Sequence, residues 1–268
     1  MIISYEYDII FPEGSAYMQK VLGYMRKAVQ EFDMIQNGDR IAVGVSGGKD
    51  SLVLLKGLIG LRRFIGIDFD IAAITIDPRF GGECGVYTAA EEICAEAQIP
   101  YTIVPTDIGE IVFEIRKEPN PCSLCAKLRR GALHNAAKEA GCNKLALGHR
   151  FDDAVETFMM NLLNEGRIGC FSPVTHLTRC GLVQIRPMVM TPEKEIIRAA
   201  NRLGLNVTKS RCPADGHTSR QRTKELIAEL ERNNKGAAER IYGAMRRAKI
   251  DGWEGKTFEN YENKIKDK

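Results

Sequence analysis

The sequence predicts an α/β protein with a doubly wound, parallel, five-stranded sheet and a small, basic, helical part at the C-terminus. Short apolar runs alternate with stretches of helical periodicity, which is the pattern of successive βαβ units. A loop with two adjacent glycines follows the first apolar run and precedes a helical stretch, as in nucleotide-binding sheets. We expect a helical N-terminal extension, a sheet domain and a basic helical region over residues 1–38, 39–210 and 211–268.

The expected elements follow the hydrophobic pattern in chain order. Residues 17–35 carry apolar residues at helical spacing, and the Asn-Gly-Asp run at 37–39 marks a turn before the sheet. Thr191 is the expected N-cap of a later helix, and the polar tail from Asp251 is expected to be loosely packed. Strands are expected over residues 41–45, 71–76, 101–104, 144–147 and 183–185, the last closing a short hairpin. The other helices are expected over residues 52–64, 87–98, 124–140, 152–164, 192–203, 220–232 and 237–248.

Basic residues are concentrated late in the chain. Residues 1–178 contain 18 Lys and Arg against 23 Asp and Glu, whereas residues 179–249 contain 16 against 7. Because neutralised phosphates release counterions, this basic stretch suits a polyanion; the alternative is a solvated helical face. The chain has no long apolar run and no signal-peptide pattern. We therefore expect a cytoplasmic protein without a membrane partner.

The glycine-rich loop between the first expected strand and the next helix is the strongest candidate for phosphate binding. Glycines let the backbone approach a phosphate, a helix N-terminus favours an anion, and lysine and serine side chains add charge and hydroxyl donors. The spacing is neither that of a Walker A loop nor that of a dinucleotide fingerprint. A plain glycine turn is the alternative. The residues of this loop are Ser46, Gly47, Gly48, Lys49, Asp50 and Ser51.

A second motif follows the fourth expected strand and opens the next helix. Strands of a parallel sheet present their carboxyl ends at one edge, so this motif is expected beside the glycine-rich loop. Its two adjacent carboxylates suit Mg²⁺ binding, or simply capping of the helix. Asp77, after the second strand, is a further candidate, with a plain loop acid as the alternative. The motif reads Gly148-His149-Arg150-Phe151-Asp152-Asp153.

Two of the eight cysteines, Cys122 and Cys125, form a C-x-x-C motif that opens a helix. Without a secretory signal, disulfides are not expected. A zinc site needs two more ligands at short spacing, and the neighbouring sequence has none. A redox pair and a pair of core cysteines are the other interpretations.

The loop at residues 46–51 resembles the PP-loop signature of the ATP pyrophosphatases, and the motif at 148–153 resembles the Gly-His-x-x-Asp-Asp of the same enzymes. The resemblance implies that ATP is cleaved between its α- and β-phosphates while a carbonyl oxygen is adenylated. It also implies that the loop holds the pyrophosphate portion of ATP together with Mg²⁺. The implied ATP-binding residues are Ser46, Gly47, Gly48, Lys49, Asp50, Ser51, Asp77, Gly148 and His149. The implied Mg²⁺ candidates are Asp50, Asp152 and Asp153.

The segment from Cys122 to Gly131 resembles the tRNA 2-thiocytidine and 2-thiouridine synthetases, a branch of this family. There, two cysteines at this place and a third much later hold a [4Fe-4S] cluster, and Cys212 matches the third. The resemblance implies one open iron for the transferred sulfur. The implied catalytic residues are Lys49, Asp153, Cys122 and Cys212. The candidates for tRNA contact, with a solvated face as the alternative, are Lys127, Arg129, Arg130, Arg220 and Arg222. The cysteines expected to be small buried apolar residues are Cys84, Cys94, Cys142, Cys170 and Cys180.

The implied reaction is adenylation of a pyrimidine C2 carbonyl in tRNA, followed by sulfur transfer, with 2-thiocytidine at position 32 of the anticodon loop as the expected product. The late site has Asp215 where a fourth cysteine is often found, and no cysteine precedes Cys84. The first departure resembles the uridine-thiolating members, whereas the second differs from them, because they usually carry zinc-finger cysteines at the N-terminus. The target base is therefore left open between cytidine and uridine. An amine-using enzyme such as tRNA lysidine synthetase and a non-catalytic iron–sulfur or zinc RNA-binding protein are the remaining alternatives. The implied partners are tRNA, a sulfur donor (sulfide or the persulfide of a cysteine desulfurase) and a second copy of the chain in a homodimer.

Overall fold

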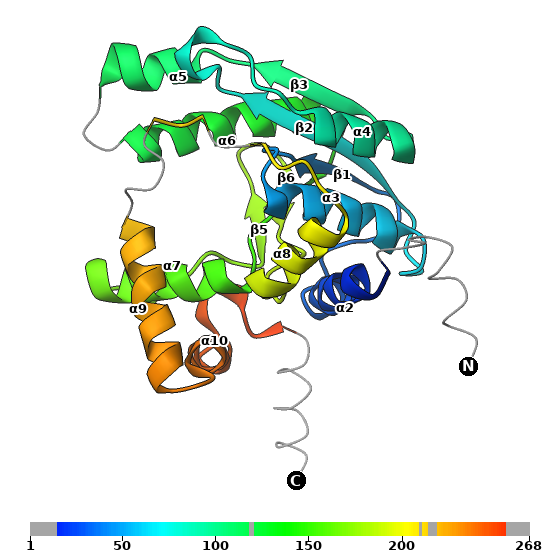
Figure 1. The fold of residues 1–268 in the computed structure, drawn as a ribbon. Helices are drawn as coiled ribbons and strands as arrows, with labels where there is room; N and C mark the ends of the chain where they lie inside the picture. The colour runs from blue at the N-terminus through cyan, green and yellow to red at the C-terminus, as the bar shows by residue number, and fades with distance from the viewer. Residues whose placement is uncertain (1–14, 118–120, 209–210, 214–218, 256–268) are drawn as a thin grey trace.

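The computed structural model describes residues 15–117, 121–208, 211–213 and 219–255, and its centre is a six-stranded sheet (Figure 1). The strand order is β3-β2-β1-β4-β6-β5, and only β5 runs antiparallel to its neighbour. The α/β class is confirmed. The strands are β1 (Asp39–Gly44), β2 (Phe69–Asp77), β3 (Tyr101–Pro105), β4 (Lys144–Ala146), β5 (Val174–Leu177) and β6 (Leu182–Ile185).

The predicted count of five strands is wrong by one, because the sequence pattern does not distinguish β5 within the hairpin that contains it. β5 lies at the edge of the sheet and three of its four residues are only partly buried, so it lacks a continuous apolar run. A tight turn with Gly181 at φ 69° joins it to β6. The added strand does not alter the parallel arrangement of the other five.

Helices cover both faces of the sheet. Alternate residues of a strand point to opposite faces, so Ile41 and Val43 join one hydrophobic cluster while Ala42 joins the other. The first cluster includes residues of α2, α3, α4 and α8, and the second includes residues of α5 and α6 (Figure 1). The helices are α2 (Ser15–Glu31), α3 (Lys49–Arg62), α4 (Thr88–Ala97), α5 (Ile108–Glu110), α6 (Pro121–Glu139), α7 (Phe151–Asn164), α8 (Glu193–Arg202), α9 (Ser219–Asn233) and α10 (Ala237–Arg247). Short helical turns occur at η1 (Phe80–Gly82), the π-helical η2 (Ile111–Arg116) and η3 (Ile250–Gly252).

Most helix ends lie within a few residues of the prediction, and two of the differences have a clear structural cause. Helix α2 stops at Glu31, before the predicted end at residue 35, because the chain turns at Asp33 with φ 53°. The N-cap of α8 is Pro192 instead of Thr191. Thr191 is fully buried, and the first N–H of α8 is taken by a carboxylate from another helix: Glu193 N donates to Asp152 Oδ2 over 2.6 Å.

The start of the C-terminal tail is anchored, which corrects the expectation of a loose tail from Asp251. Trp253 is completely buried, and its indole Nε1 donates to the Phe171 carbonyl over 2.6 Å. The Asp251 carboxylate accepts the backbone N–H of Cys170 over 2.7 Å. The indole is the largest apolar side chain available, so the free energy gained by burying it holds this segment against the domain although its neighbours in sequence are polar. Residues 256–268 lie outside the described residues. Among the described helices, none has both the length and the apolar character needed to cross a bilayer.

Candidate nucleotide and cysteine site

The glycine-rich loop and the 148–153 motif meet at the point where the strand order reverses. Strands β1 and β4 are neighbours at the centre of the sheet, β2 and β3 lie beyond β1, and β6 and β5 lie beyond β4. The loops after β1 and β4 therefore face each other across the switch point, where open α/β sheets bind ligands. A side chain at Gly148 would come within 3.3 Å of the Asp50 backbone, so glycine is needed for this approach.

The loop has its own hydrogen-bonded shape. Gly47 has φ 78°, a conformation that favours glycine. The backbone N–H of Ser46 donates to Ser51 Oγ over 3.1 Å, and Ser51 Oγ donates to the Gly48 carbonyl over 2.9 Å. The Gly47 carbonyl accepts the backbone N–H of Thr208 over 3.0 Å. The loop is thus ordered by its own serines and by a distant segment.

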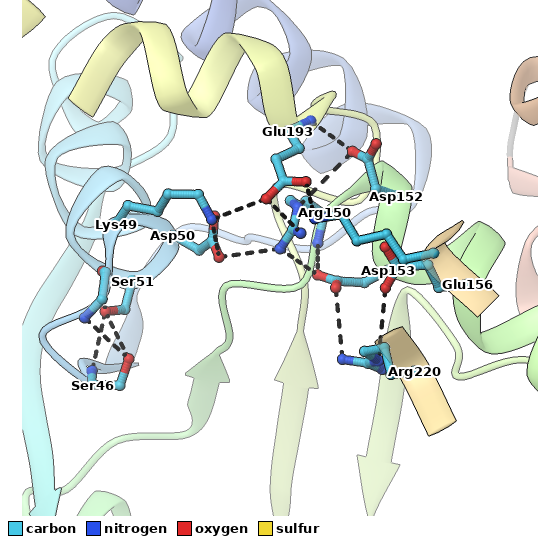
Figure 2. A network of polar contacts seen from close by, with 12 residues as sticks. Ser46, Lys49, Asp50, Ser51, Arg150, Asp152, Asp153, Glu156, Glu193 and Arg220 are labelled. Atoms are coloured by element: carbon cyan, nitrogen blue, oxygen red, sulfur yellow. Dashed lines mark hydrogen bonds and ion pairs between the residues drawn. The ribbon is translucent and has the colours of Figure 1, made fainter. Parts of the chain in front are cut away.

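A buried arginine, Arg150, lies between the two loops (Figure 2). Its Nη1 lies 3.1 Å from Asp50 Oδ2 and 3.4 Å from Asp153 Oδ2, and its Nη2 lies 3.0 Å from Glu193 Oε1. Its backbone N–H also donates to Asp153 Oδ2 over 3.0 Å. Burial alone would lower the pKa of Arg150, but the carboxylates of Asp153, Asp50 and Glu193 raise it.

Glu193, the first residue of α8, is the second unexpected member of this network. Its carboxylate lies 3.1 Å from Lys49 Nζ and 2.8 Å from Lys224 Nζ on α9. Burial would raise the pKa of Glu193, but Lys224, Arg150 and Lys49 lower it to about 2. Sequence reasoning found neither Arg150 nor Glu193 as site residues. Arg150 falls at a variable position of its motif, and Glu193 lies outside every motif.

The carboxylates predicted to handle Mg²⁺ are already engaged by protein groups. Asp153 accepts the backbone N–H of Arg150, the N-cap of α7, and its Oδ1 lies 3.7 Å from Arg220 Nη1, while Asp152 accepts the N–H of Glu193. Asp50 Oδ1, by contrast, is buried with no hydrogen-bond partner in the described structure. Over the described ranges, no three His, Cys, Asp or Glu side chains are arranged to hold a metal ion.

A cavity of about 400 Å³ opens beside the loop, between α6 and the ends of β1 and β4. Its floor is apolar, with Ile74, Ile76 and Leu145, and its rim has Ser46 together with charged groups. His149 faces this cavity; burial first, and then the charge of Arg186, lower its pKa to about 4. The imidazole is therefore neutral near pH 7. The predicted site residues that line this cavity are Ser46, Asp50, Ser51, Arg129, Arg130, Gly148 and His149.

A second cavity of about 270 Å³, here called the cysteine cavity, is lined by two of the three candidate cysteines. Cys125 and Cys212 both line it, although they are 87 residues apart in the chain. Ser46 and Arg129 line both cavities, so the two adjoin. Asp77 lines the second cavity as well, where its carboxylate accepts the backbone N–H groups of residues 79 and 85 over 3.0 and 2.9 Å. Asp77 thus shapes the wall of the cysteine cavity.

Cys122 and Cys212 both lie within electrostatic reach of Cys125, although the three thiols are not arranged as a ready metal-binding group. Burial raises the pKa of the Cys125 thiol, the charge of Arg129 lowers it, and Cys212 and Cys122 raise it further. Cys122 is exposed and Cys212 is partly exposed. Of the other five, Cys94, Cys142 and Cys170 are buried as expected; the expectation is wrong for exposed Cys84 and only partly met by Cys180. Cys84 is exposed because its loop lies on the rim of the cysteine cavity, where its carbonyl accepts Arg211 Nη1 over 3.0 Å.

The candidate tRNA-binding residues occupy two helices. Lys127 and Arg130 of α6 are exposed, and Arg129 is partly exposed between the two cavities. On α9, Arg222 is exposed, whereas Arg220 lies 3.7 Å from both Asp153 and Glu156. A contact of Arg220 with RNA would therefore compete with these carboxylates. Their role in tRNA binding stays a prediction.

A doubly wound sheet with a glycine-rich loop at its switch point defines a nucleotide-binding α/β protein, here with thiols beside the loop. The chain belongs to the PP-loop family, because the family profile described as a PP-loop domain matches residues 20–230. The family resemblance of the two sequence motifs is thereby confirmed.

Several similar proteins are named as tRNA sulfurtransferases or tRNA thiolases. A protein of Pelobacter propionicus named tRNA-cytidine(32) 2-sulfurtransferase is 42% identical over 208 residues, which cover 76% of this chain and 77% of the relative. A protein of the same name from Citrifermentans bemidjiense is 40% identical over 225 residues, covering 82% and 86%. Among solved structures, the U34-tRNA thiolase NcsA from Methanococcus maripaludis with its [4Fe-4S] cluster aligns with a TM-score of 0.71 and 28% identity, covering 88% of this chain and 79% of that chain.

Proposed function

We propose that this protein is an ATP-dependent tRNA sulfurtransferase that forms 2-thiocytidine at position 32 of the anticodon loop. The observation that carries the proposal is the adjacency of the two cavities, which share Ser46 and Arg129. A base activated beside the phosphate loop therefore lies next to the cysteines. Relatives that are 42% and 40% identical, named tRNA-cytidine(32) 2-sulfurtransferases, support cytidine as the target.

In the first half-reaction, the C2 oxygen of the base attacks the α-phosphorus of ATP, and the bond to the departing pyrophosphate breaks. The serines and backbone N–H groups of the loop bind phosphate oxygens, and Lys49 offsets the charge that develops on them. Lys49 must leave Glu193, 3.1 Å away, to do so. His149 borders the same cavity as a neutral imidazole. We assign a catalytic role to Asp153. We further propose that Mg²⁺ enters the site bound to ATP.

In the second half-reaction, sulfur attacks C2 and the bond to the AMP oxygen breaks. The three thiols suit an iron–sulfur group, because thiolates are its usual protein ligands and Cys125 and Cys212 already line one cavity. A [4Fe-4S] cluster held by Cys122, Cys125 and Cys212 would leave one iron open to supply the sulfur site. Arg129, on the shared wall, is placed to stabilise the negative charge of the adenylated base.

The basic helices suit the RNA backbone. Lys127, Arg130 and Arg222 are exposed, and Arg129 borders both cavities, so the α6 residues would hold the target base and α9 the backbone. We assign the sulfur supply to sulfide, or to the persulfide of a cysteine desulfurase whose S–S bond is cleaved by a thiol reductant that releases the outer sulfur as sulfide. We further propose that the enzyme works as a homodimer in the cytoplasm.

The test is mass spectrometry of nucleosides from tRNA incubated with anaerobically purified enzyme, ATP and sulfide. We expect 2-thiocytidine with the wild type. Lys49→Ala should abolish AMP formation, and Cys122→Ala should lose iron and thiolation. Cys94→Ala is the matched control, because Cys94 is a core thiol and should leave both unchanged. Undiminished AMP formation by Lys49→Ala would contradict adenylation, and full thiolation by Cys122→Ala would contradict the role of the cysteines.

A second candidate is 2-thiouridine synthesis, which the similarity to a U34-tRNA thiolase favours. The same nucleoside analysis separates the two, because the products differ in mass and position. An amine-using PP-loop enzyme would instead keep its activity after removal of all three cysteines.

A further inference from the structure

The side chain of Arg150 sits where its charge meets carboxylates from three helices. Asp50 belongs to α3, Asp153 to α7 and Glu193 to α8, and one guanidinium contacts all three within 3.4 Å (Figure 2). The arginine side chain is only 10% exposed. A planar guanidinium with five donors fits several carboxylates at once, whereas a lysine offers one point charge.

With the guanidinium in place, the three carboxylates surround Arg150 and are not arranged to hold a metal ion. Three carboxylates converging within a few ångströms repel one another unless a cation lies among them. Mg²⁺ requires six oxygens near octahedral geometry and is usually held by one or two carboxylates plus substrate phosphates. Here the protein provides the cation itself. The other oxygen of Asp153 lies beside Arg220, and the neighbouring carboxylate of Asp152 accepts the backbone N–H of Glu193.

We propose that Arg150 is a positioning residue that acts as the internal cation of the Asp50–Asp153–Glu193 cluster, so that the protein binds no divalent cation there before a nucleotide arrives. The inference rests on the proposed use of ATP for its role in the reaction. By joining Asp50 to Asp153, the guanidinium sets the spacing between the phosphate loop and α7. The guanidinium also fixes the position of Glu193. Because Glu193 pairs with Lys49, this contact determines where Lys49 lies before it moves to the phosphates.

Divalent-cation binding without nucleotide tests the proposal. Mn²⁺ is the probe, titrated into the full-length holoprotein and followed by electron paramagnetic resonance of the free ion. We expect no site tighter than millimolar in the wild type. Arg150→Gln should gain one Mn²⁺ site at least about tenfold tighter, because the three carboxylates lose the cation that contacts all of them, while Lys49, Lys224 and Arg220 keep their own ion pairs at the edge of the cluster. Arg198→Gln is the matched control: it removes an arginine that pairs with Glu195 on α8, outside the cluster, and should gain no site.

Two further variants make the result decisive. Arg150→Gln combined with Asp153→Asn should lose the gained site, which locates it. Arg150→Lys keeps the charge and should remain without a Mn²⁺ site, while kcat for AMP formation falls several-fold and KM for ATP changes little, because one ammonium cannot bridge three carboxylates.

Three results would overturn the proposal. One is a wild-type Mn²⁺ site that disappears in Asp153→Asn, and it decides the matter even if Arg150→Gln does not fold. The others are a folded Arg150→Gln protein that gains no site, and an Arg150→Lys protein with the kcat of the wild type. The titration requires neither tRNA nor sulfur, so a failure of the proposed thiolation would leave its outcome unchanged.

Discussion

The backbone N–H of Thr208 donates to the carbonyl of Gly47 over 3.0 Å, which joins the phosphate loop to the segment that leads to Cys212. The Thr208 hydroxyl also donates to the carbonyl of Val86 over 2.9 Å, on the loop that borders the cysteine cavity. Three segments distant in sequence are thus held together beside the cysteine cavity, which Thr208 lines. Disturbing this contact should affect ATP use and the cysteines together.

Gly47→Ala should lower both AMP formation and thiolation. A side chain at φ 78° costs about 1–2 kcal/mol, and its Cβ would lie 2.9 Å from Thr208 Oγ1. Steady-state AMP formation and iron content are the measurements. Gly23→Ala in α2 is the control, since a Cβ there meets no atom within 4 Å; it should keep activity and gain about 0.5–1 kcal/mol of stability. Equal activity of the two variants would contradict the coupling.

Removing the charge of Arg129 should make Cys125 less reactive. Arg129 lowers the pKa of Cys125 against the effect of burial, so Arg129→Gln should raise that pKa and reduce the thiolate fraction. Alkylation of iron-free protein by iodoacetamide, mapped to Cys125 by peptide mass spectrometry, checks this. Lys127→Gln, two residues away and exposed, should leave the rate unchanged.

Glu156 should make stability fall as the pH rises toward neutrality. Burial first, and then the nearby Asp153, raise the pKa of Glu156 from 4.5 to about 7, so folding favours its protonated form. That contribution is complete below pH 4.5 and is lost as the pH rises through 7, a loss of roughly 3 kcal/mol. Urea unfolding of wild type and Glu156→Gln at pH 5 and pH 7.5 is the test. The variant should lose this part of the pH dependence, and a wild-type slope retained in the variant would contradict the assignment.

Trp253→Ala should destabilise the protein by about 3–5 kcal/mol, because the indole is fully buried and makes a hydrogen bond to Phe171. Thermal or urea unfolding measures the loss. Ile168→Ala provides the comparison: that side chain is 70% exposed, and its removal should change the unfolding free energy by at most about 0.5 kcal/mol.

Arg222→Ala should weaken tRNA binding with little effect on ATP. The side chain is exposed on α9, so losing one phosphate contact should lower the slope of log affinity against log salt by about one. Filter binding at several salt concentrations measures it. Lys20→Ala on α2 is the control, since it removes an exposed charge from another helix. An unchanged slope in Arg222→Ala would exclude Arg222 from this contact.

Local patterns in the sequence determined the class of fold, the phosphate loop and the first two cysteines of interest, Cys122 and Cys125. Strand and helix alternation depends on periodicity within a few residues, and the spacing in Ser46–Ser51 and Cys122–Cys125 is equally short. The resemblance to a PP-loop family followed from these motifs and was confirmed. The third cysteine, Cys212, came from the resemblance alone, because no periodicity relates it to the other two.

Only the tertiary structure decided which charges meet. Arg150 contacts Glu193 across 43 residues, Asp152 caps α8 in place of Thr191, and Trp253 is buried against Phe171. Each of these contacts joins elements that become neighbours only when the sheet has assembled. Long-range pairing leaves no mark on local hydrophobic periodicity, so a single sequence carries no signal for it. The residue types of the loops predicted their chemistry, whereas tertiary packing determined which charged groups pair with their side chains.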